Sequence, residues 1–118
     1  MNFRFPKSEK LKSRKTIELL FSEGKSVTKF PIKVFYLPVE NNEKTQAGFA
    51  VPKRNFKNAV DRNRIKRQLR EAYRLQKHLL KKEGDSKFAL FFLYLGKDKL
   101  PYASIEKAMK SLIENINT

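Results

Sequence analysis

The sequence contains no cysteine, no tryptophan and a single histidine, His78, among its 118 residues. Without cysteine there is no disulfide framework, no thiolate metal site and no cysteine nucleophile. A lone histidine also argues against a multi-histidine metal site and against a serine–histidine catalytic pair. The longest apolar run, residues 88–95, is far shorter than the roughly 20 residues of a membrane-spanning helix. The N-terminal residues show no signal-peptide pattern, so we expect no membrane partner and a cytoplasmic protein.

Acidic side chains are scarce. The chain has 27 Lys and Arg residues against 12 Asp and Glu residues, which gives a formal net charge of +15. Residues 53–82 hold 12 of the basic residues and only two acidic ones, and so carry +10 of that charge. This balance predicts a polyanionic partner. An apolar content of 40% still predicts a folded protein rather than a disordered basic tail, and the length fits a single domain over residues 1–118.

The first half of the chain predicts one helix and two or three strands. Residues 1–10 should be a loosely ordered lead-in. Ser13 is a suitable N-cap for a short helix, and Gly24 is a suitable C-terminal stop. Residues 27–39 and 46–51 are rich in β-branched and aromatic residues, which favours strands, and residues 40–43 are typical of a turn.

The second half predicts a long helix, a strand and a last helix. Asn58 is the expected N-cap of the long helix, with Asp61 in its first turn, and the helix should stop by Gly84. Residues 87–95 form an apolar run typical of a strand buried on both faces. The last helix should start near Pro101, with an apolar stripe formed by Ile105, Ala108, Met109, Leu112 and Ile116.

The long helix should carry a basic face opposite its apolar stripe. Ordinary surface helices alternate charge signs to gain pairs between neighbouring turns, whereas only Glu71 interrupts this face. A solvated surface helix and a membrane-surface or calmodulin-target helix are the alternatives. The apolar stripe, with Ala72 and Gln76 in it, fits docking on a sheet better than insertion in a membrane. The stripe comprises Ile65, Leu69, Ala72, Tyr73, Gln76, Leu79 and Leu80, and the basic face comprises Lys66, Arg67, Arg70, Arg74, Lys77 and Lys81.

Residues 53–74 resemble the signature of the protein subunit of bacterial ribonuclease P. The family core is Arg-Asn-Arg, then Ile-Lys-Arg, then Arg-Glu, and residues 62–67 with 70–71 match it at every position. The layout of residues 9–116 agrees with the family as well. The resemblance implies an α+β fold, a two-layer α/β sandwich with element order α-β-β-(β)-α-β-α. It also implies a left-handed βαβ crossover, as in the second domain of ribosomal protein S5.

The resemblance further implies a non-catalytic subunit of an endoribonuclease. In the family, a catalytic RNA and one protein together remove the 5′ leader of precursor tRNA by magnesium-dependent hydrolysis. The active site and the Mg²⁺ ions belong mainly to the RNA, so no catalytic residue, metal ligand or cofactor is expected in the protein alone. The residues support this expectation, because no cluster of carboxylates suited to two metal ions is visible in the sequence.

Two groups of site residues follow from the family positions. By family position the leader-binding cleft would include Ile17, Phe21 and Phe35, although Ile17 stands where the family often has an aromatic residue and Phe35 where it often has tyrosine. Lys33 is added to the cleft because it lies beside Phe35 in the sequence. Phe21 fits a core stripe equally well, so core and cleft both stay open for it. The residues expected to contact RNA are Lys53, Arg54, Arg62, Asn63, Arg64, Lys66, Arg67, Arg70 and Arg74.

Two rival functions share part of this chemistry. A structural RNA-binding protein of the ribosomal type would have the same electrostatics and no substrate of its own. A protein nuclease acting alone would cleave RNA without an RNA partner.

Overall fold

The computed structural model describes residues 10–39, 45–77 and 87–116. The expected order of elements is confirmed, and the optional third strand is the first half of a hairpin that turns at Phe30 and Pro31. In chain order the elements are α1 (Arg14–Glu23), β1 (Lys25–Lys29), β2 (Ile32–Val39), β3 (Gln46–Ala50), α2 (Ala59–Gln76), β4 (Lys87–Tyr94) and α3 (Tyr102–Ile116).

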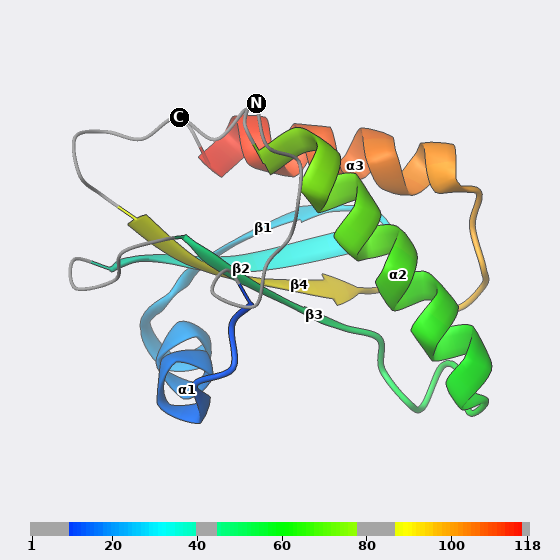
Figure 1. The fold of residues 1–118 in the computed structure, drawn as a ribbon, viewed down its shortest axis with the longest axis horizontal. Helices are drawn as coiled ribbons and strands as arrows, with labels where there is room; N and C mark the ends of the chain where they lie inside the picture. The colour runs from blue at the N-terminus through cyan, green and yellow to red at the C-terminus, as the bar shows by residue number, and fades with distance from the viewer. Residues whose placement is uncertain (1–9, 40–44, 78–86, 117–118) are drawn as a thin grey trace.

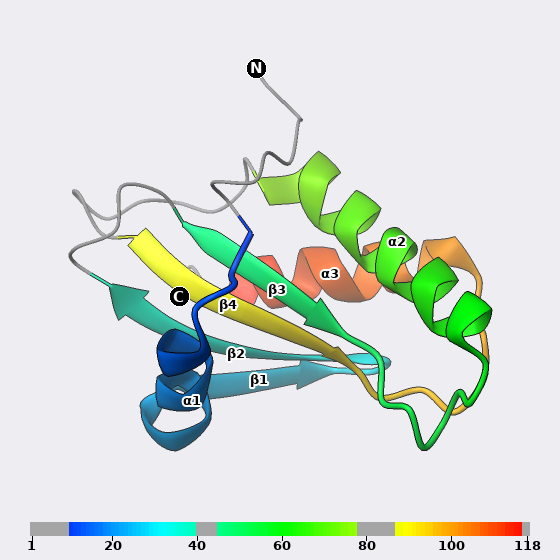
Figure 2. The ribbon, with the colours of Figure 1, turned by 60° about the horizontal axis from the view of Figure 1, so that its bottom comes forward.

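The four strands form one mixed sheet in the order β1-β2-β4-β3. The β1–β2 and β2–β4 pairs are antiparallel, whereas β3 and β4 are parallel neighbours joined through α2. This β3–α2–β4 crossover is left-handed, as can be followed in Figures 1 and 2. Crossovers between parallel strands are right-handed in almost all proteins, so the observed hand is a distinctive feature of the fold.

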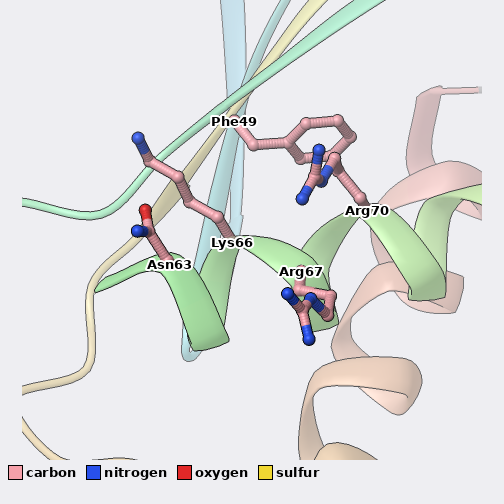
Figure 3. Close-up of a pocket in the computed structure, with 5 residues that line it drawn as sticks. All are labelled: Phe49, Asn63, Lys66, Arg67 and Arg70. Carbon is pink, nitrogen blue, oxygen red and sulfur yellow. The ribbon is translucent and has the colours of Figure 1, made fainter. Parts of the chain in front are cut away.

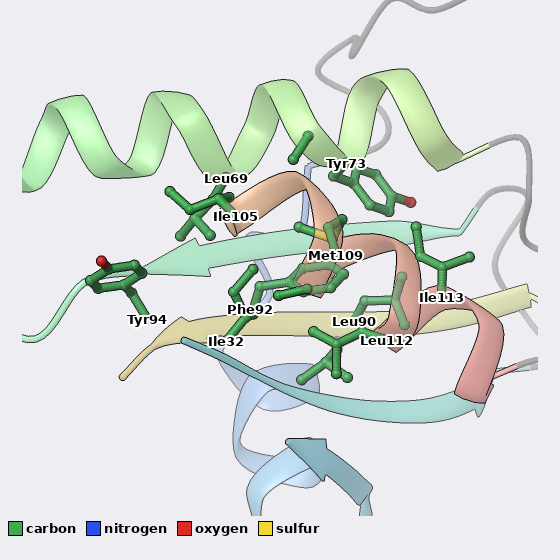
Figure 4. Close-up of a cluster of buried hydrophobic side chains, with 14 of the residues drawn as sticks. Ile32, Leu69, Tyr73, Leu90, Phe92, Tyr94, Ile105, Met109, Leu112 and Ile113 are labelled. Carbon is green, nitrogen blue, oxygen red and sulfur yellow. The ribbon is translucent and has the colours of Figure 1, made fainter. Parts of the chain in front are cut away.

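The helices lie on both faces of the sheet: α2 and α3 cover one face and α1 packs on the other (Figure 1). Strand alternation decides which side chains enter the main core. Ile32 and Val34 of β2 and Leu90 and Phe92 of β4 point to α2 and α3 and are fully buried (Figure 4). The two long helices complete this core with Ile65, Leu69, Ala72, Tyr73, Ile105, Ala108, Met109, Leu112, Ile113 and Ile116.

The ends of α1 are formed by the two residues that the sequence indicates. The Ser13 hydroxyl accepts a hydrogen bond from the Thr16 N–H at 3.3 Å, and Gly24 follows the last helical residue. Gly24 does not adopt the left-handed conformation that is common at helix ends, because its φ is −71°. The glycine is required by space instead, since a Cβ at this position would collide with the Leu20 carbonyl oxygen.

Strand β4 corrects one expectation. On its core face Leu90, Phe92 and Tyr94 are fully buried and Phe88 is half-buried. On the other face Phe91 and Leu93 are only half-buried, and Ala89 is the one buried residue among the described side chains. The apolar run therefore overstates the burial of β4. The short helix α1 covers only part of the sheet face that these side chains occupy.

Of the loose lead-in expected over residues 1–10, only Lys10 is described, and it differs from the expectation because it pairs with Ala47 of β3. Several other sequence predictions fall outside the described residues: the turn at residues 40–43, the end of the long helix near Gly84, and the positions of His78, Leu79, Leu80 and Lys81. Within the described part of the chain, no helix is long and apolar enough to span a membrane.

Candidate nucleic-acid interface

The start of α2 is fixed by two contacts with the loop that precedes it. The Asn58 side chain caps the helix by accepting the Val60 N–H at 2.9 Å, as the sequence predicts. Arg62 turns back toward the loop, and its Nη1 donates to the carbonyl oxygens of Phe56 at 2.7 Å and Lys57 at 2.9 Å. Arg62 therefore has a structural role that its place in the family motif does not reveal.

The next turns of α2 present exposed polar and basic side chains. Asn63, Arg64, Arg67 and Arg70 are exposed, and Lys66 is half-buried. Helical spacing places four of these residues on one side of α2, where they line a hollow of about 380 Å³ (Figure 3). Arg64 does not line it. The fifth lining residue is the half-buried Phe49 of β3, which the sequence did not single out, and the full set is Phe49, Asn63, Lys66, Arg67 and Arg70.

A second hollow of about 270 Å³ adjoins the first along α2 and shares Arg67 and Arg70 with it. Its other lining residues are Arg74 and Glu71 of α2 and Lys10, which precedes α1. The Arg74 guanidinium donates through Nε to Glu71 Oε2 at 3.1 Å and through Nη2 to Oε1. These hydrogen bonds lower the pKa of the Glu71 carboxyl below its ordinary value, so Glu71 is ionised at neutral pH.

Lys53 and Arg54 lie in the loop between β3 and α2, and both side chains are exposed. They line neither of the two hollows. Asp61, the acidic residue in the first turn of α2, forms an ion pair with Lys99, with an N–O distance of 2.9 Å. The basic character of this end of α2 is therefore only partly offset by its own carboxylates.

The opposite face of the sheet carries an aromatic cluster next to α1. Phe21 makes edge-on contacts with Phe35 of β2 and Phe91 of β4, with ring centroids at 4.9 and 5.4 Å. The Lys33 ammonium lies over the Phe35 ring, 4.9 Å from its centroid. Ile17 packs half-buried at the same cluster. The four residues expected in the leader-binding cleft thus come together, and Phe91 joins them.

The structure decides between the two possible positions of Phe21. Its side chain is 53% exposed, whereas Leu20 beside it is fully buried. Phe21 therefore belongs to the surface cluster and not to the core. Phe91 escaped the sequence analysis because its run of apolar neighbours predicts burial on both faces.

Gly48 makes room for this cluster. Gly48 of β3 is the direct neighbour of Phe91 in the parallel β3–β4 pair. A Cβ on Gly48 would lie 3.1 Å from the Phe91 ring and 3.5 Å from the Leu11 Cβ. A larger residue at this position would therefore require the Phe91 ring to shift.

The described residues contain no group of three or more His, Cys, Asp or Glu side chains that could hold a metal ion. What the two surfaces offer chemically is binding. Guanidinium and ammonium groups bind phosphate oxygens, and exposed aromatic rings beside a cation suit unstacked bases.

Comparisons with known proteins agree on one family. The Ribonuclease P family model matches residues 5–117. The ribonuclease P protein component of Porphyromonas gingivalis is 38% identical over 117 residues, which cover 94% of this chain and 85% of the relative. The corresponding protein of Chlorobaculum tepidum is 34% identical over 128 residues, covering 93% of this chain and 83% of the relative.

Solved structures of RNase P proteins share the fold. The protein from Staphylococcus aureus matches with a TM-score of 0.77 at 18% identity, over 92% of this chain and 94% of that chain. The protein from Thermotoga maritima matches with a TM-score of 0.75 at 22% identity, over 91% of this chain and 96% of that chain. At these identities the likeness supports the α+β fold alone.

Proposed function

This chain belongs to the bacterial ribonuclease P protein family, and from that premise we propose that it binds the catalytic RNA of ribonuclease P together with the 5′ leader of precursor tRNA. Family membership makes it a subunit of an endoribonuclease holoenzyme that processes tRNA. The proposal adds separate roles for the protein and the RNA. The protein binds and positions RNA, and the catalytic RNA cleaves the leader to give the mature 5′ end.

The observation that carries the proposal is the basic side of α2. Arg67 and Arg70 are exposed, one helical turn apart, and line both hollows. Arginine suits such a surface because its planar guanidinium grips a phosphate through two parallel hydrogen bonds. Folded RNA presents phosphates from several strands at once. The catalytic RNA is therefore the proposed ligand of this side of α2, with Lys53 and Arg54 as additional contacts.

The aromatic cluster on the opposite face is the proposed leader site. A single-stranded leader exposes bases that can stack on Phe21, Phe35 and Phe91 while Lys33 neutralises a phosphate. An RNA-binding protein of the ribosomal type has no substrate of its own to place on this second surface. The pair of surfaces therefore favours a protein that contacts both an RNA partner and a substrate.

The Mg²⁺ ions of the proposed reaction are held by the RNA. The described residues contain no group of three or more His, Cys, Asp or Glu side chains that could hold a metal ion, and the proposal assigns none to the protein alone. We further propose a stoichiometry of one protein per catalytic RNA and a cytoplasmic location.

Reconstitution tests the proposal directly. The protein is mixed with the catalytic RNA and a precursor tRNA at low Mg²⁺, where we expect it to accelerate removal of the leader. The pure protein should cleave nothing. Cleavage by the protein without RNA would favour the lone-nuclease alternative. Binding of ribosomal RNA with no effect on precursor tRNA would favour the ribosomal type.

Variants of α2 assign the RNA surface. Arg67→Ala and Arg70→Ala should each weaken binding of the catalytic RNA by about 1 kcal/mol or more, as expected for a charged hydrogen bond. The salt dependence of binding should also become shallower, by about 0.7 in the logarithmic slope per lost phosphate contact. Lys110→Ala, an exposed charge on α3, is the charge-matched control. Unchanged affinity and slope in both arginine variants would refute the assignment.

A further inference from the structure

The second hollow on α2 combines four cations with one carboxylate. Lys10, Arg67, Arg70 and Arg74 surround a space of about 270 Å³, and Glu71 lines the same space. A phosphate group fits among such cations. Glu71 is the unexplained member, because a negative charge in a phosphate site repels the ligand.

Lys10 is brought to this hollow by a long-range contact. It forms a parallel bridge with Ala47 of β3, and the next residue, Leu11, donates its N–H to the Ala47 carbonyl at 2.9 Å. Leu11 is buried in the cluster under α1. In Figure 2 this part of the chain passes β3 before it enters α1. The backbone of Lys10 is therefore paired with the β3 edge, and from there Lys10 lines the hollow on α2.

Glu71 occupies the part of Arg74 that a phosphate would use. Its two oxygens accept from Nε and Nη2 of the same guanidinium. Two parallel N–H donors on one edge are also the arrangement through which arginine binds phosphate. Both groups are half-exposed, with side-chain exposures of 46% for Glu71 and 32% for Arg74, so an incoming ligand can reach the pair.

We propose that this hollow binds a backbone phosphate of the catalytic RNA, with Lys10 as a ligand, and that Glu71 is an internal competitor for Arg74 which the phosphate displaces. The inference rests on the proposed function, because it concerns the same RNA and the same side of α2. In this arrangement Glu71 weakens binding of every RNA phosphate at Arg74. Only an RNA that also engages Arg67, Arg70 and Lys10 gains enough to displace it.

The test measures binding of the catalytic RNA to the full chain as a function of KCl concentration. Glu71→Gln keeps the size of the side chain and removes its charge. We expect about two- to fivefold tighter binding, the range expected for one exposed ion pair, and a salt slope steeper by about 0.7. Glu114→Gln on α3 changes the net charge equally, lines neither hollow, and should change the affinity much less.

Lys10→Ala should do the opposite. We expect binding about two- to fivefold weaker, with a slope shallower by about 0.7, and a smaller effect from Lys110→Ala. When Arg74→Ala is already present, adding Glu71→Gln should no longer tighten binding of the catalytic RNA, because Glu71 competes only for Arg74. Thermal melts of every variant verify that the fold is retained.

The contrary outcomes are distinct. Weaker RNA binding by the Glu71→Gln variant would show that Glu71 orients Arg74 for RNA, and it would contradict the proposal that Glu71 competes with the phosphate. If Glu71→Gln and Glu114→Gln raise the affinity for the catalytic RNA equally, the change in net charge alone explains the effect, and the competitor role is contradicted. Equal effects of Lys10→Ala and Lys110→Ala would remove Lys10 from the site. If the unaltered protein does not bind the catalytic RNA, the proposed function fails, and this inference fails with it.

Discussion

At the scale of single side chains, Phe21 shows how exposure separates binding from stability. The ring is half-exposed and its contacts are the edges of Phe35 and Phe91. Such aromatic pairs contribute about 0.5–1.5 kcal/mol each beyond the area they bury. The side chain therefore stabilises the fold modestly while offering a surface for a base.

Phe21→Ala should accordingly cost less stability than the roughly 3–5 kcal/mol typical of a fully buried phenylalanine. Its affinity for precursor tRNA in the holoenzyme should fall by about 1–3 kcal/mol for the lost stacking contact, with mature tRNA little affected. Denaturant unfolding and binding with long and trimmed leaders measure the two quantities. Phe30→Ala, at a position 70% exposed in the β1–β2 turn, is the control. A large stability loss without leader dependence would contradict this assignment.

Two tyrosines provide a contrast in buried hydroxyl groups. The Tyr94 hydroxyl donates to the Asp98 carbonyl at 2.7 Å, whereas the buried Tyr102 hydroxyl has no hydrogen-bond partner among the described residues. Tyr94→Phe should therefore cost about 1 kcal/mol of unfolding free energy. Tyr102→Phe should be neutral or slightly stabilising, because it removes an unsatisfied group. Urea unfolding at neutral pH compares them, and equal losses would contradict the difference.

The same residues predict an alkaline effect. Burial raises the pKa of both Tyr94 and Tyr102 above the ordinary value for a phenol. The folded state thus favours the neutral phenol. This contribution is complete below about pH 10 and is lost as the pH rises through the raised pKa. The stability difference between the unaltered protein and Tyr94→Phe should therefore shrink above pH 10.

At the scale of elements, the start of α2 depends on one arginine more than on its neighbours. Arg62→Ala removes both hydrogen bonds to the preceding loop and should lower the unfolding free energy by about 1 kcal/mol or more. Arg64→Ala, at an exposed position two residues on, should leave stability unchanged. Thermal melts without RNA test the pair. Equal melting temperatures would show that the loop is held without Arg62.

The elements that could be predicted from the sequence are those set by local spacing. The caps Ser13 and Asn58 and the apolar stripes of α2 and α3 depend on residues within a few turns of one another, and the structure confirms them for the described residues. The basic side of α2 follows from the same spacing. The left-handed hand of the crossover came from the family resemblance, since general rules predict the opposite.

What escaped the sequence analysis depends on pairing between distant segments. Phe49 and Phe91 reach their sites through the register of β3 and β4, which hydrophobic periodicity does not determine. Lys10 reaches α2 only because the segment before α1 pairs with Ala47. The predicted burial of β4 is too high for a related reason, because an apolar run does not show how much of the strand a helix will cover.

At the scale of the whole molecule, the charge of +15 opposes the compact state. Like charges on α2 and its loops repel one another, and an excess of one sign destabilises folding. Anions that bind only the folded protein offset this by mass action. The protein without RNA should therefore melt at a higher temperature in sulfate than in chloride at matched ionic strength. Identical melting temperatures in the two salts would show that the fold already relieves the repulsion.

The pairing of Lys10 with Ala47 also bears on how the protein behaves at high concentration. The outer edge of a sheet carries unpaired N–H and C=O groups that can recruit a strand from another molecule. The segment before α1 occupies the β3 edge at Ala47, and the other outer strand, β1, begins and ends with the exposed lysines Lys25 and Lys29. Edge lysines oppose the addition of a further strand. The chain itself thus covers the β3 border at Ala47, and charged residues flank the β1 border. Both features oppose intermolecular β-pairing and favour a dispersed protein at high concentration.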